Sequence, residues 1–339
     1  MSAPFLPAGD PVAPALRGFA RAHAHLVELR EEPVHLRARE RDPRRVVGLV
    51  AGGGSGHEPM HAGFLGRGML DAVAPGQVFA SPHNRQVLHA SLAAAGPEGV
   101  VHVVKNYTGD RINFGIAAER LRHEGVRVGR VLVDDDLATD DTDGAMGRRG
   151  TGATVVVEKL LGAAADEGRG LDELTDLGNA VAAASRSLAV ASRAQTSFHT
   201  GEPAFHLGAG ELEYGVGIHG ERAATTIDRP PLPDLVVRMI DELLTGLPPG
   251  PGELLVLVNG MGATTQLELY GIFDQAAAVL EERGLRVAES LVGTYVPALD
   301  MAGFSLTLTR LQDGWRTWWR APARTPAFPV LDDVDEEGR

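Results

Sequence analysis

The 339-residue chain contains no cysteine. This absence excludes disulfides, thiolate nucleophiles and thiolate metal sites, and it is typical of a reducing compartment. No apolar run approaches the roughly 20 residues that span a membrane. Residues 1–10 also lack the basic and apolar regions of a secretion signal. We therefore expect a cytoplasmic protein with no membrane partner.

Basic residues are also scarce relative to acidic ones. The chain has 32 Lys and Arg against 45 Asp and Glu, a net charge of -13. A phosphate backbone would repel such a chain on average, so we expect no nucleic-acid partner. The apolar fraction of 44% suffices for globular cores. The length exceeds what one core usually organises, which favours two domains.

The first half of the chain alternates short β-branched runs with stretches long enough for a helix. The runs are Val46–Val50, Val100–Val104 and Val128–Val133, and the helical stretches include Val87–Ala95 and Phe114–His123. This alternation is typical of βαβ units, in which helices cover a mainly parallel sheet.

The second half repeats the pattern with strands at Leu254–Val258 and Arg286–Leu291 around a helix at Leu267–Arg283. In Phe304–Leu308 apolar residues alternate with polar ones, which indicates a strand with one wetter face. The predicted fold class is therefore α/β, with two lobes that each contain a mostly parallel or mixed sheet covered by helices.

The boundary between the lobes is placed where the composition changes. A helical pattern rich in Ala and Leu runs over Leu171–Ala191 and is followed by Phe, His, Gly and Glu. We predict a first lobe at 1–191, a second at 192–330 and an acidic tail at 331–339.

A glycine-rich loop, AGGGSGHEP at residues 51–59, follows the first predicted strand. Its glycines let backbone amides approach a ligand closely. A dinucleotide fingerprint would need glycine at His57 or Pro59, and no P-loop ending in Gly-Lys-Ser/Thr occurs in the sequence. The loop therefore predicts a ligand other than a nucleoside triphosphate, with a tight turn that binds nothing as the alternative.

Residues 57–61 read HEPMH, which formally matches a zinc-protease pattern. The pattern needs both histidines on one continuous helix. Because proline is suited to the first helical turn, we expect the helix to begin at about Pro59 and His57 to stay in the loop. Arg67 stands where a third ligand is needed, so we predict no metal site.

A second polar loop, KNYTGDR at residues 105–111, follows the strand Val100–Val104. Carboxyl ends of parallel strands meet at one edge of a sheet, so this loop should converge with the glycine loop. Asp110 beside His57 would form an acid/base pair. Alternatively, Asp110 and Arg111 cap the following helix.

His219 lies between glycines in GVGIHGE, residues 215–221, which suggests a ring left free rather than packed. The acidic run Asp134–Asp136 lacks the alternation and terminal glutamate of a calcium loop. We expect that run to form a solvated loop.

Five segments resemble, in order and approximate spacing, the K domain of dihydroxyacetone kinases. They are GGSGHEP (53–59), KNYTGDRINFG (105–115), GIHGE (217–221), ELYG (268–271) and LDMAGFS (299–305). The resemblance covers almost the whole chain. It implies two α/β lobes and a homodimer.

The resemblance also implies roles for individual residues. The histidine matching His219 attacks the ligand carbonyl to give a hemiaminal, and this selects carbonyl compounds because a polyol offers nothing to add to. Asp110 is then the base for the hydroxyl to be phosphorylated, assisted by His57. The residues that line the site are Gly54, Ser55, Gly56 and Lys105.

Fused kinases of this family carry a second, nucleotide-binding domain, for which 339 residues leave no room. The resemblance therefore implies that a separate L-type subunit holds Mg-ADP or Mg-ATP and that this chain carries no cofactor. The donor, a phosphoenolpyruvate relay or ATP, is left open.

The chain departs from the family pattern at His83–Arg85, at Arg222 and at Glu158, where a histidine is common. A related ketose such as erythrulose therefore remains a possible substrate. A second hypothesis is a ligand-sensing paralogue without catalysis, against which Asp110 argues. A third, a zinc hydrolase, is testable by metal analysis.

Overall fold

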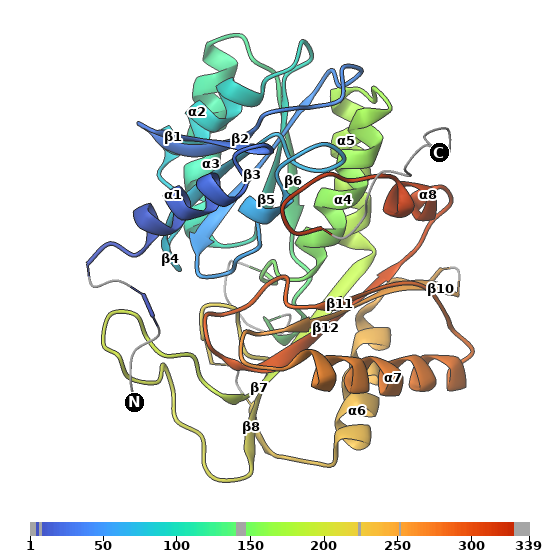
Figure 1. Ribbon diagram of the computed structural model, residues 1–339. Helices are drawn as coiled ribbons and strands as arrows, with labels where there is room; N and C mark the ends of the chain where they lie inside the picture. Colours follow the sequence, from blue (N-terminus) through green and yellow to red (C-terminus); the bar gives the residue numbers. More distant parts are fainter. Residues whose placement is uncertain (1–4, 7–8, 140–146, 223–224, 251, 329–339) are drawn as a thin grey trace, which may run out of the picture.

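The computed structural model describes residues 5–6, 9–139, 147–222, 225–250 and 252–328. They form two six-stranded sheets, each with its own helices, stacked one above the other in Figure 1. The predicted tail at 331–339 lies outside the described residues. Within the described ranges, no helix combines the length and apolar character needed to cross a bilayer.

The first sheet is mixed, with strand order β1-β2-β4-β3-β5-β6. Strands β3 to β6 run parallel to one another, whereas β1 and β2 form an antiparallel hairpin at one edge. Strand β5 is buried along its whole length, as expected for a continuous valine run covered on both faces. The strands are β1 (Val27–Glu31), β2 (Val34–Ala38), β3 (Gly48–Ser55), β4 (Ala72–Val78), β5 (Val100–Lys105) and β6 (Val128–Val133).

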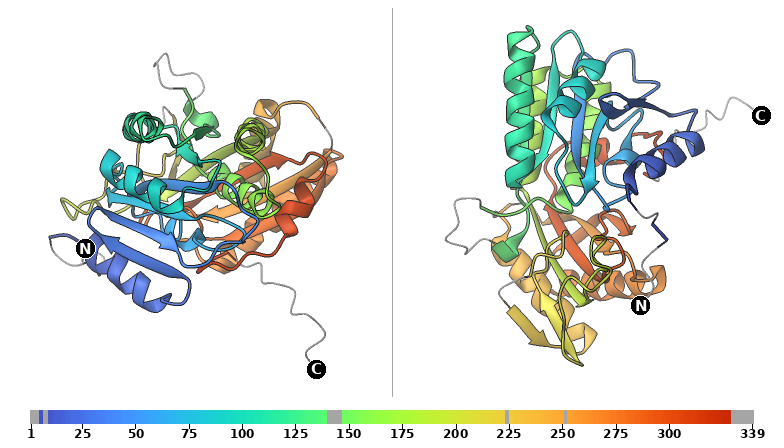
Figure 2. Two further views of the ribbon diagram at one scale, coloured as in Figure 1. Left: turned by 90° about the horizontal axis from the view of Figure 1, so that it is seen from above. Right: turned by 90° about the vertical axis from the view of Figure 1, so that its left-hand side faces the viewer.

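Two helix pairs cover this sheet. Alternate β5 residues point to opposite faces: Val100 and Val104 pack with α2 and α3, and Val101 and Val103 pack on the side of α4 and α5. Helix α1 lies beside β1 at the edge of the lobe (Figure 2). The helices are α1 (Val12–Ala22), α2 (Asn84–Ala94), α3 (Thr108–His123), α4 (Ala153–Asp166) and α5 (Leu171–Ala183), with short 3₁₀ turns η1 (Ala62–Phe64) and η2 (Leu137–Thr139).

The second sheet has the order β11-β10-β12-β7-β8-β9, and only β10 and β11 are parallel. Helices α6 and α7 cover its outer face, as Figure 1 shows. The elements are β7 (Ser185–Arg193), β8 (Glu211–Tyr214), β9 (Thr225–Asp228), α6 (Leu232–Gly246), β10 (Glu253–Gly260), α7 (Gln266–Glu282), β11 (Arg286–Gly293), β12 (Ala302–Arg310) and α8 (Trp315–Arg320). The prediction of two mixed sheets covered by helices is confirmed.

One of the three hydrophobic clusters in the described part of the chain contains residues of both lobes. On β10, Leu254 and Val256 pack under α6 and α7, whereas Leu255 and Leu257 join a cluster with Val156 and Leu160 of α4. Helix α4 is buried along almost its whole length as a result. It therefore lies between the sheets and fixes their loops relative to each other.

The helix predicted over Leu171–Ala191 ends at Ala183, and the rest of that segment belongs to β7. Strand β7 pairs with β12 in the second sheet, from Ser185 opposite Thr309 to Arg193 opposite Ala302. Alanine and leucine favour a helix locally, but this pairing overrides that preference. The predicted division after residue 191 therefore falls inside a strand.

The prediction of a solvated loop at Asp134–Asp136 is wrong for its last two residues. Asp135 is fully buried and accepts hydrogen bonds from the amides of Thr151 (2.7 Å) and Ala153 (2.9 Å). Asp136 pairs with Arg149 (2.6 Å). These carboxylates tie the end of β6 to the start of α4, because buried amides and cations need acceptors.

Candidate active site

His219 lies in the loop after β8, with its side chain beside Glu221. Its Nδ1 lies 2.7 Å from Glu221 Oε1, and its backbone amide donates to Glu221 Oε2 (2.9 Å). Burial raises the pKa of Glu221, but the hydrogen bond from His219 and the charges of His219 and Arg149 lower it to about 2. An ionised carboxylate only accepts, so Nδ1 carries the proton. In the neutral ring, Nε2 then carries the lone pair.

The glycines around His219 make room for neighbouring side chains. A Cβ at Gly217 would lie 2.1 Å from Glu221 Oε2, and one at Gly220 would lie 2.0 Å from Gln195 Nε2. Gly220 also has φ +79°, which suits glycine. The two glycines thus make room for the side chains of Glu221 and Gln195. They do not leave the His219 ring unpacked, so the expectation of an unpacked ring is wrong.

His57 follows the end of β3 and is fully buried. Its Nδ1 lies 2.7 Å from the carbonyl oxygen of Pro297, in the second lobe, so Nδ1 donates there. Among the described residues, its Nε2 has no hydrogen-bond partner. Desolvation, with smaller contributions from the charges of His219 and Lys105, lowers the pKa of His57 well below its ordinary value. The ring is therefore neutral, with a buried lone pair.

Three aromatic rings bring the lobes together around His219. Its ring centroid lies 4.9 Å from His57, 5.4 Å from Phe79 and 4.6 Å from Tyr107. His57 also stacks on Phe79 at 5.0 Å. The glycine loop and the loop after β5 therefore converge, as the sequence predicts, on the histidine of the other lobe.

Asp110 lies in the first turn of α3, three residues after Tyr107, which is the helix N-cap. The carboxyl group is buried, and its Oδ1 has no partner in the described part of the chain. Its Oδ2 lies 3.7 Å from Lys105 Nζ, a distance that permits an ion pair but no hydrogen bond. An unbonded carboxylate oxygen in a buried site is suited to accept a proton.

Lys105 ends β5 and is also buried. Its Nζ lies 2.9 Å from His61 Nε2 and 3.3 Å from the carbonyl oxygen of Gly52. A Cβ at Gly53 would lie 2.2 Å from this nitrogen, so Gly53 must be glycine for the ammonium to fit. The glycine loop thus accommodates a buried cation.

The other residues of the glycine loop have structural contacts of their own. Ser55 Oγ donates to the carbonyl oxygen of Gly76 (2.8 Å), and the carbonyl oxygen of Gly56 accepts from Leu299 in the second lobe (3.1 Å). A Cβ at Gly54 would lie 2.7 Å from the amide nitrogen of Ala80. These residues shape the wall of the site.

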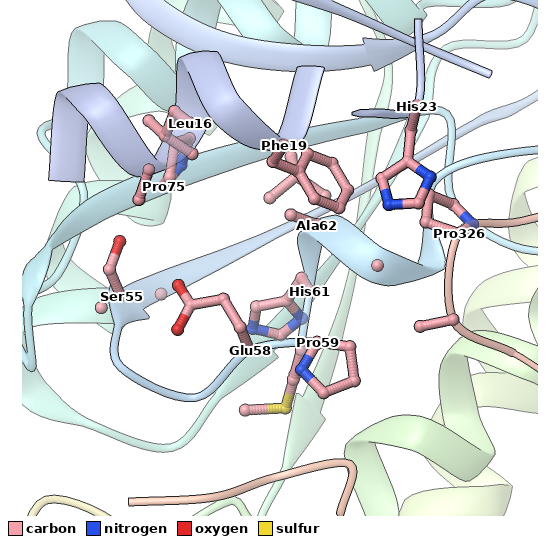
Figure 3. A pocket seen from close by; sticks show the side chains of 17 residues that line it. Leu16, Phe19, His23, Ser55, Glu58, Pro59, His61, Ala62, Pro75 and Pro326 are labelled. Carbon is pink, nitrogen blue, oxygen red and sulfur yellow. The ribbon is translucent and has the colours of Figure 1, made fainter. Parts of the chain in front are cut away.

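A cavity of about 340 Å³ lies against this loop, between it and α1. Figure 3 shows Ser55, Glu58 and His61 opposite Leu16 and Phe19. No helix begins at Pro59; residues 57–61 form a turn that leads into η1. His57 stays outside a helix as predicted, but the predicted helix start is wrong.

Sequence reasoning missed Phe79, His61 and Glu158 as parts of the site. Phe79 lies in no sequence motif. In the structure its backbone φ of 55° is unusual for a bulky residue. His61 appeared only in the rejected zinc pattern, and Glu158 only as a departure from the family. Glu158 Oε1 lies 2.5 Å from His61 Nδ1, across 97 residues of sequence.

The protein is therefore of a two-lobed α/β class. Its two mixed sheets meet at a buried cluster of His, Asp and Lys side chains. Residues 17–327 match the Dak1 domain model, so the chain belongs to the Dak1 domain family. It is 39% identical to the "PEP-dependent dihydroxyacetone kinase, dihydroxyacetone-binding subunit DhaK" of Escherichia coli (strain K12), over 92% of this chain and 95% of that protein. The resemblance seen in the sequence is confirmed.

Two solved structures are similar. The native dihydroxyacetone kinase of C. freundii matches with a TM-score of 0.83 and 34% identity, over 94% of this chain and 58% of that one. The "Dihydroxyacetone kinase operon co-activator Dha-DhaQ" matches with a TM-score of 0.89 and 29% identity, over 95% of this chain and 100% of that one. The fold therefore occurs both in a kinase and in a co-activator.

Proposed function

We propose that this chain is the dihydroxyacetone-binding subunit of a dihydroxyacetone kinase, and that it holds its substrate as a hemiaminal on His219. The observation that carries the proposal is a set of unsatisfied buried acceptors beside that histidine. Within the described residues, His57 Nε2 and Asp110 Oδ1 lack partners. Buried acceptors without donors are costly. A hydroxyketone supplies hydroxyl donors for them and a carbonyl for His219.

The proposed adduct forms when His219 Nε2 attacks the carbonyl carbon. A nitrogen–carbon bond forms and the C=O π bond breaks. The ring keeps its Nδ1 proton and becomes a cation beside the Glu221 carboxylate, and the carbonyl oxygen takes up one proton from solvent. Glu221 accepts the hydrogen bond of that Nδ1 proton. Glycerol has no carbonyl and forms no such bond.

In the proposed transfer, a hydroxyl oxygen of the bound ketose attacks phosphorus, and its proton passes to Asp110. The oxygen–phosphorus bond to the donor breaks, and the donor leaves with that electron pair. We infer that a separate L-type subunit presents the donor with its magnesium ion, and that no nucleotide binds this chain. General-base help of this kind contributes roughly 10²- to 10⁴-fold.

The test is a phosphorylation assay on purified chain with an L-type subunit. Dihydroxyacetone, erythrulose and glycerol are compared with either ATP or a phosphoenolpyruvate relay. We expect turnover of a ketose only with the partner present. Robust phosphorylation by the isolated chain with ATP, or equal use of glycerol, would contradict the proposal.

The similarity to the co-activator structure favours a second candidate, a ligand-binding regulator without catalysis. Both candidates predict an adduct on His219. Only the kinase subunit requires a buried base, and Asp110 supplies one. An adduct without turnover with any L-type subunit would support the regulator.

A further inference from the structure

A buried chain of hydrogen bonds leads from Lys105 through His61 to Glu158 of α4. Lys105 Nζ lies 2.9 Å from His61 Nε2, and His61 Nδ1 lies 2.5 Å from Glu158 Oε1. All three residues are buried, and Glu158 is 0% exposed. Glu158 comes from α4, His61 from the turn after β3 and Lys105 from the end of β5. Three separate elements therefore meet behind the ammonium group.

The direction of each hydrogen bond follows from the donor inventory. An ammonium group only donates, so His61 Nε2 must accept. The neutral ring then carries its proton on Nδ1 and donates it to Glu158. Desolvation lowers the pKa of His61 well below its ordinary value, with the charge of Lys105 acting in the same direction, so the ring has one proton. Glu158 Oε1 can accept that proton's hydrogen bond whether or not the carboxyl group is ionised.

The side chains of His61 and Glu158 compete with Asp110 for the ammonium group of Lys105. Lys105 Nζ is within hydrogen-bond distance of His61 but 3.7 Å from Asp110 Oδ2. If the Nδ1 proton of His61 lost its acceptor, the ring would no longer be held in the orientation that presents Nε2 to the ammonium. Lys105 would then move toward Asp110 and engage the proposed base.

We propose that Glu158 and His61 are positioning residues for the transfer step: they hold Lys105 off Asp110, which leaves that carboxylate free to accept the substrate proton. This inference rests on the proposed function. Among the described residues, the other charged and titratable groups that face these three side chains are Asp110 on α3 and His57 on the glycine loop. Neither lies on the helix that carries Glu158.

The decisive variant is Glu158→Met, which keeps an unbranched side chain and removes the acceptor. Because it leaves the buried Nδ1–H of His61 without an acceptor, some loss of stability is expected, and circular dichroism checks that the variant is folded at the assay temperature. We expect kcat with the L-type partner to fall about ten-fold or more, as for loss of a hydrogen bond to a charged group. The acid limb of the kcat profile should move as well, because Lys105 would then pair with Asp110. The adduct on His219, in the other lobe, should remain.

Two variants separate positioning from a merely structural role. Glu158→Gln keeps a side-chain oxygen for His61 and should restore most of kcat and the acid limb. Lys159→Met changes the next residue of α4, which is buried and donates to the carbonyl oxygen of Trp318 (2.7 Å), away from the site. It should leave both readouts unchanged. A Glu158→Met enzyme with the wild-type kcat and acid limb overturns the inference.

A readout independent of activity is the ¹⁵N NMR spectrum of the His61 ring. Wild type should carry its proton on Nδ1 and show the shift of an Nε2 that accepts from the ammonium, and Glu158→Met should lose that Nε2 shift. A wild-type ring protonated on Nε2, or no change in the variant, contradicts the inference even if turnover behaves as expected. If wild type turns over no ketose at all, the proposed function fails, and the NMR result still decides the positioning claim.

Discussion

The two lobes each contribute a histidine to the same site, and they hold it in opposite ways. His219 of the second lobe retains an 18% exposed side chain and is bonded to the carboxylate of Glu221. His57 of the first lobe is fully buried and is bonded to a neutral carbonyl group. Both therefore carry their proton on Nδ1 and present Nε2.

The difference lies in what the ring can do next. A carboxylate beside Nδ1 stabilises positive charge on the ring as Nε2 forms a bond, whereas a carbonyl group supports a neutral ring that only accepts. The comparison teaches that the partner of Nδ1, rather than the histidine itself, decides whether the ring is suited to act as a nucleophile or only as a hydrogen-bond acceptor.

The strongest way to break this comparison is His219→Ala. We expect complete loss of the covalent adduct with dihydroxyacetone and of the preference for the ketone over glycerol, because the nucleophile is gone. Intact-protein mass spectrometry and a crystal soak measure this. His199→Ala, an exposed histidine of the same lobe, is the control. A ketone preference that survives in His219→Ala would assign the nucleophile elsewhere.

Asp110→Asn tests the first-lobe side of the site without changing its shape. Adduct formation should survive, while phosphoryl transfer falls by roughly 10²-fold or more, since general-base catalysis contributes 10²- to 10⁴-fold. Single-turnover kinetics with the L-type partner and adduct mass separate the two. Equal losses of adduct and transfer would make Asp110 a binding residue instead.

Glu221→Gln sharpens the comparison by giving His219 a neutral partner like that of His57. The side-chain oxygen still accepts from Nδ1, but the charge is lost. We expect adduct affinity to fall about ten-fold or more, given roughly 1.5–3 kcal/mol for a hydrogen bond to a charged group. Titration by mass spectrometry checks it, with Glu211→Gln on β8 as the matched control. An unchanged affinity would remove the distinction between the two histidines.

The smallest effect concerns stability and uses His102, a core histidine buried like His57. Desolvation lowers the pKa of His102 to about 3, and its Nε2 bonds to Ser91 Oγ (2.8 Å). A depressed pKa means that the unfolded chain binds this proton first, so stability is present above pH 6.5 and is lost as pH falls toward 3. From pH 6.5 to 5, wild type should lose about 2 kcal/mol more than His102→Gln.

Urea unfolding at the two pH values measures this difference. His123→Gln, at an exposed position of α3, controls for the loss of a histidine as such. Parallel losses in wild type and His102→Gln would show that burial does not keep His102 neutral.

The sequence predicted the elements whose pattern is local. Strands β5 and β6 and helix α7 lie within a residue or so of their predicted ranges, because valine runs and 3.6-residue periodicity report burial directly. Strand β7 was assigned to a helix, since its pairing with β12 joins residues more than 100 positions apart. The acidic run after β6 was predicted to be solvent-exposed. Its pattern gives no sign of the amides of Thr151 and Ala153 and of Arg149, which bind it from further along the chain.

By itself, the sequence determined which residues are candidates for the chemistry: His57, Asp110 and His219 stand in motifs whose residue types and spacing predict a role. Only the tertiary structure decided how each is held. Pro297 bonds to His57 across 240 residues, Glu158 bonds to His61 across 97, and His61 bonds to Lys105 across 44. A hydrogen bond acts only over about 3 Å, so no local pattern encodes which distant group will lie at that distance. Packing of α4 between the two sheets sets those distances, and with them the tautomer of each ring.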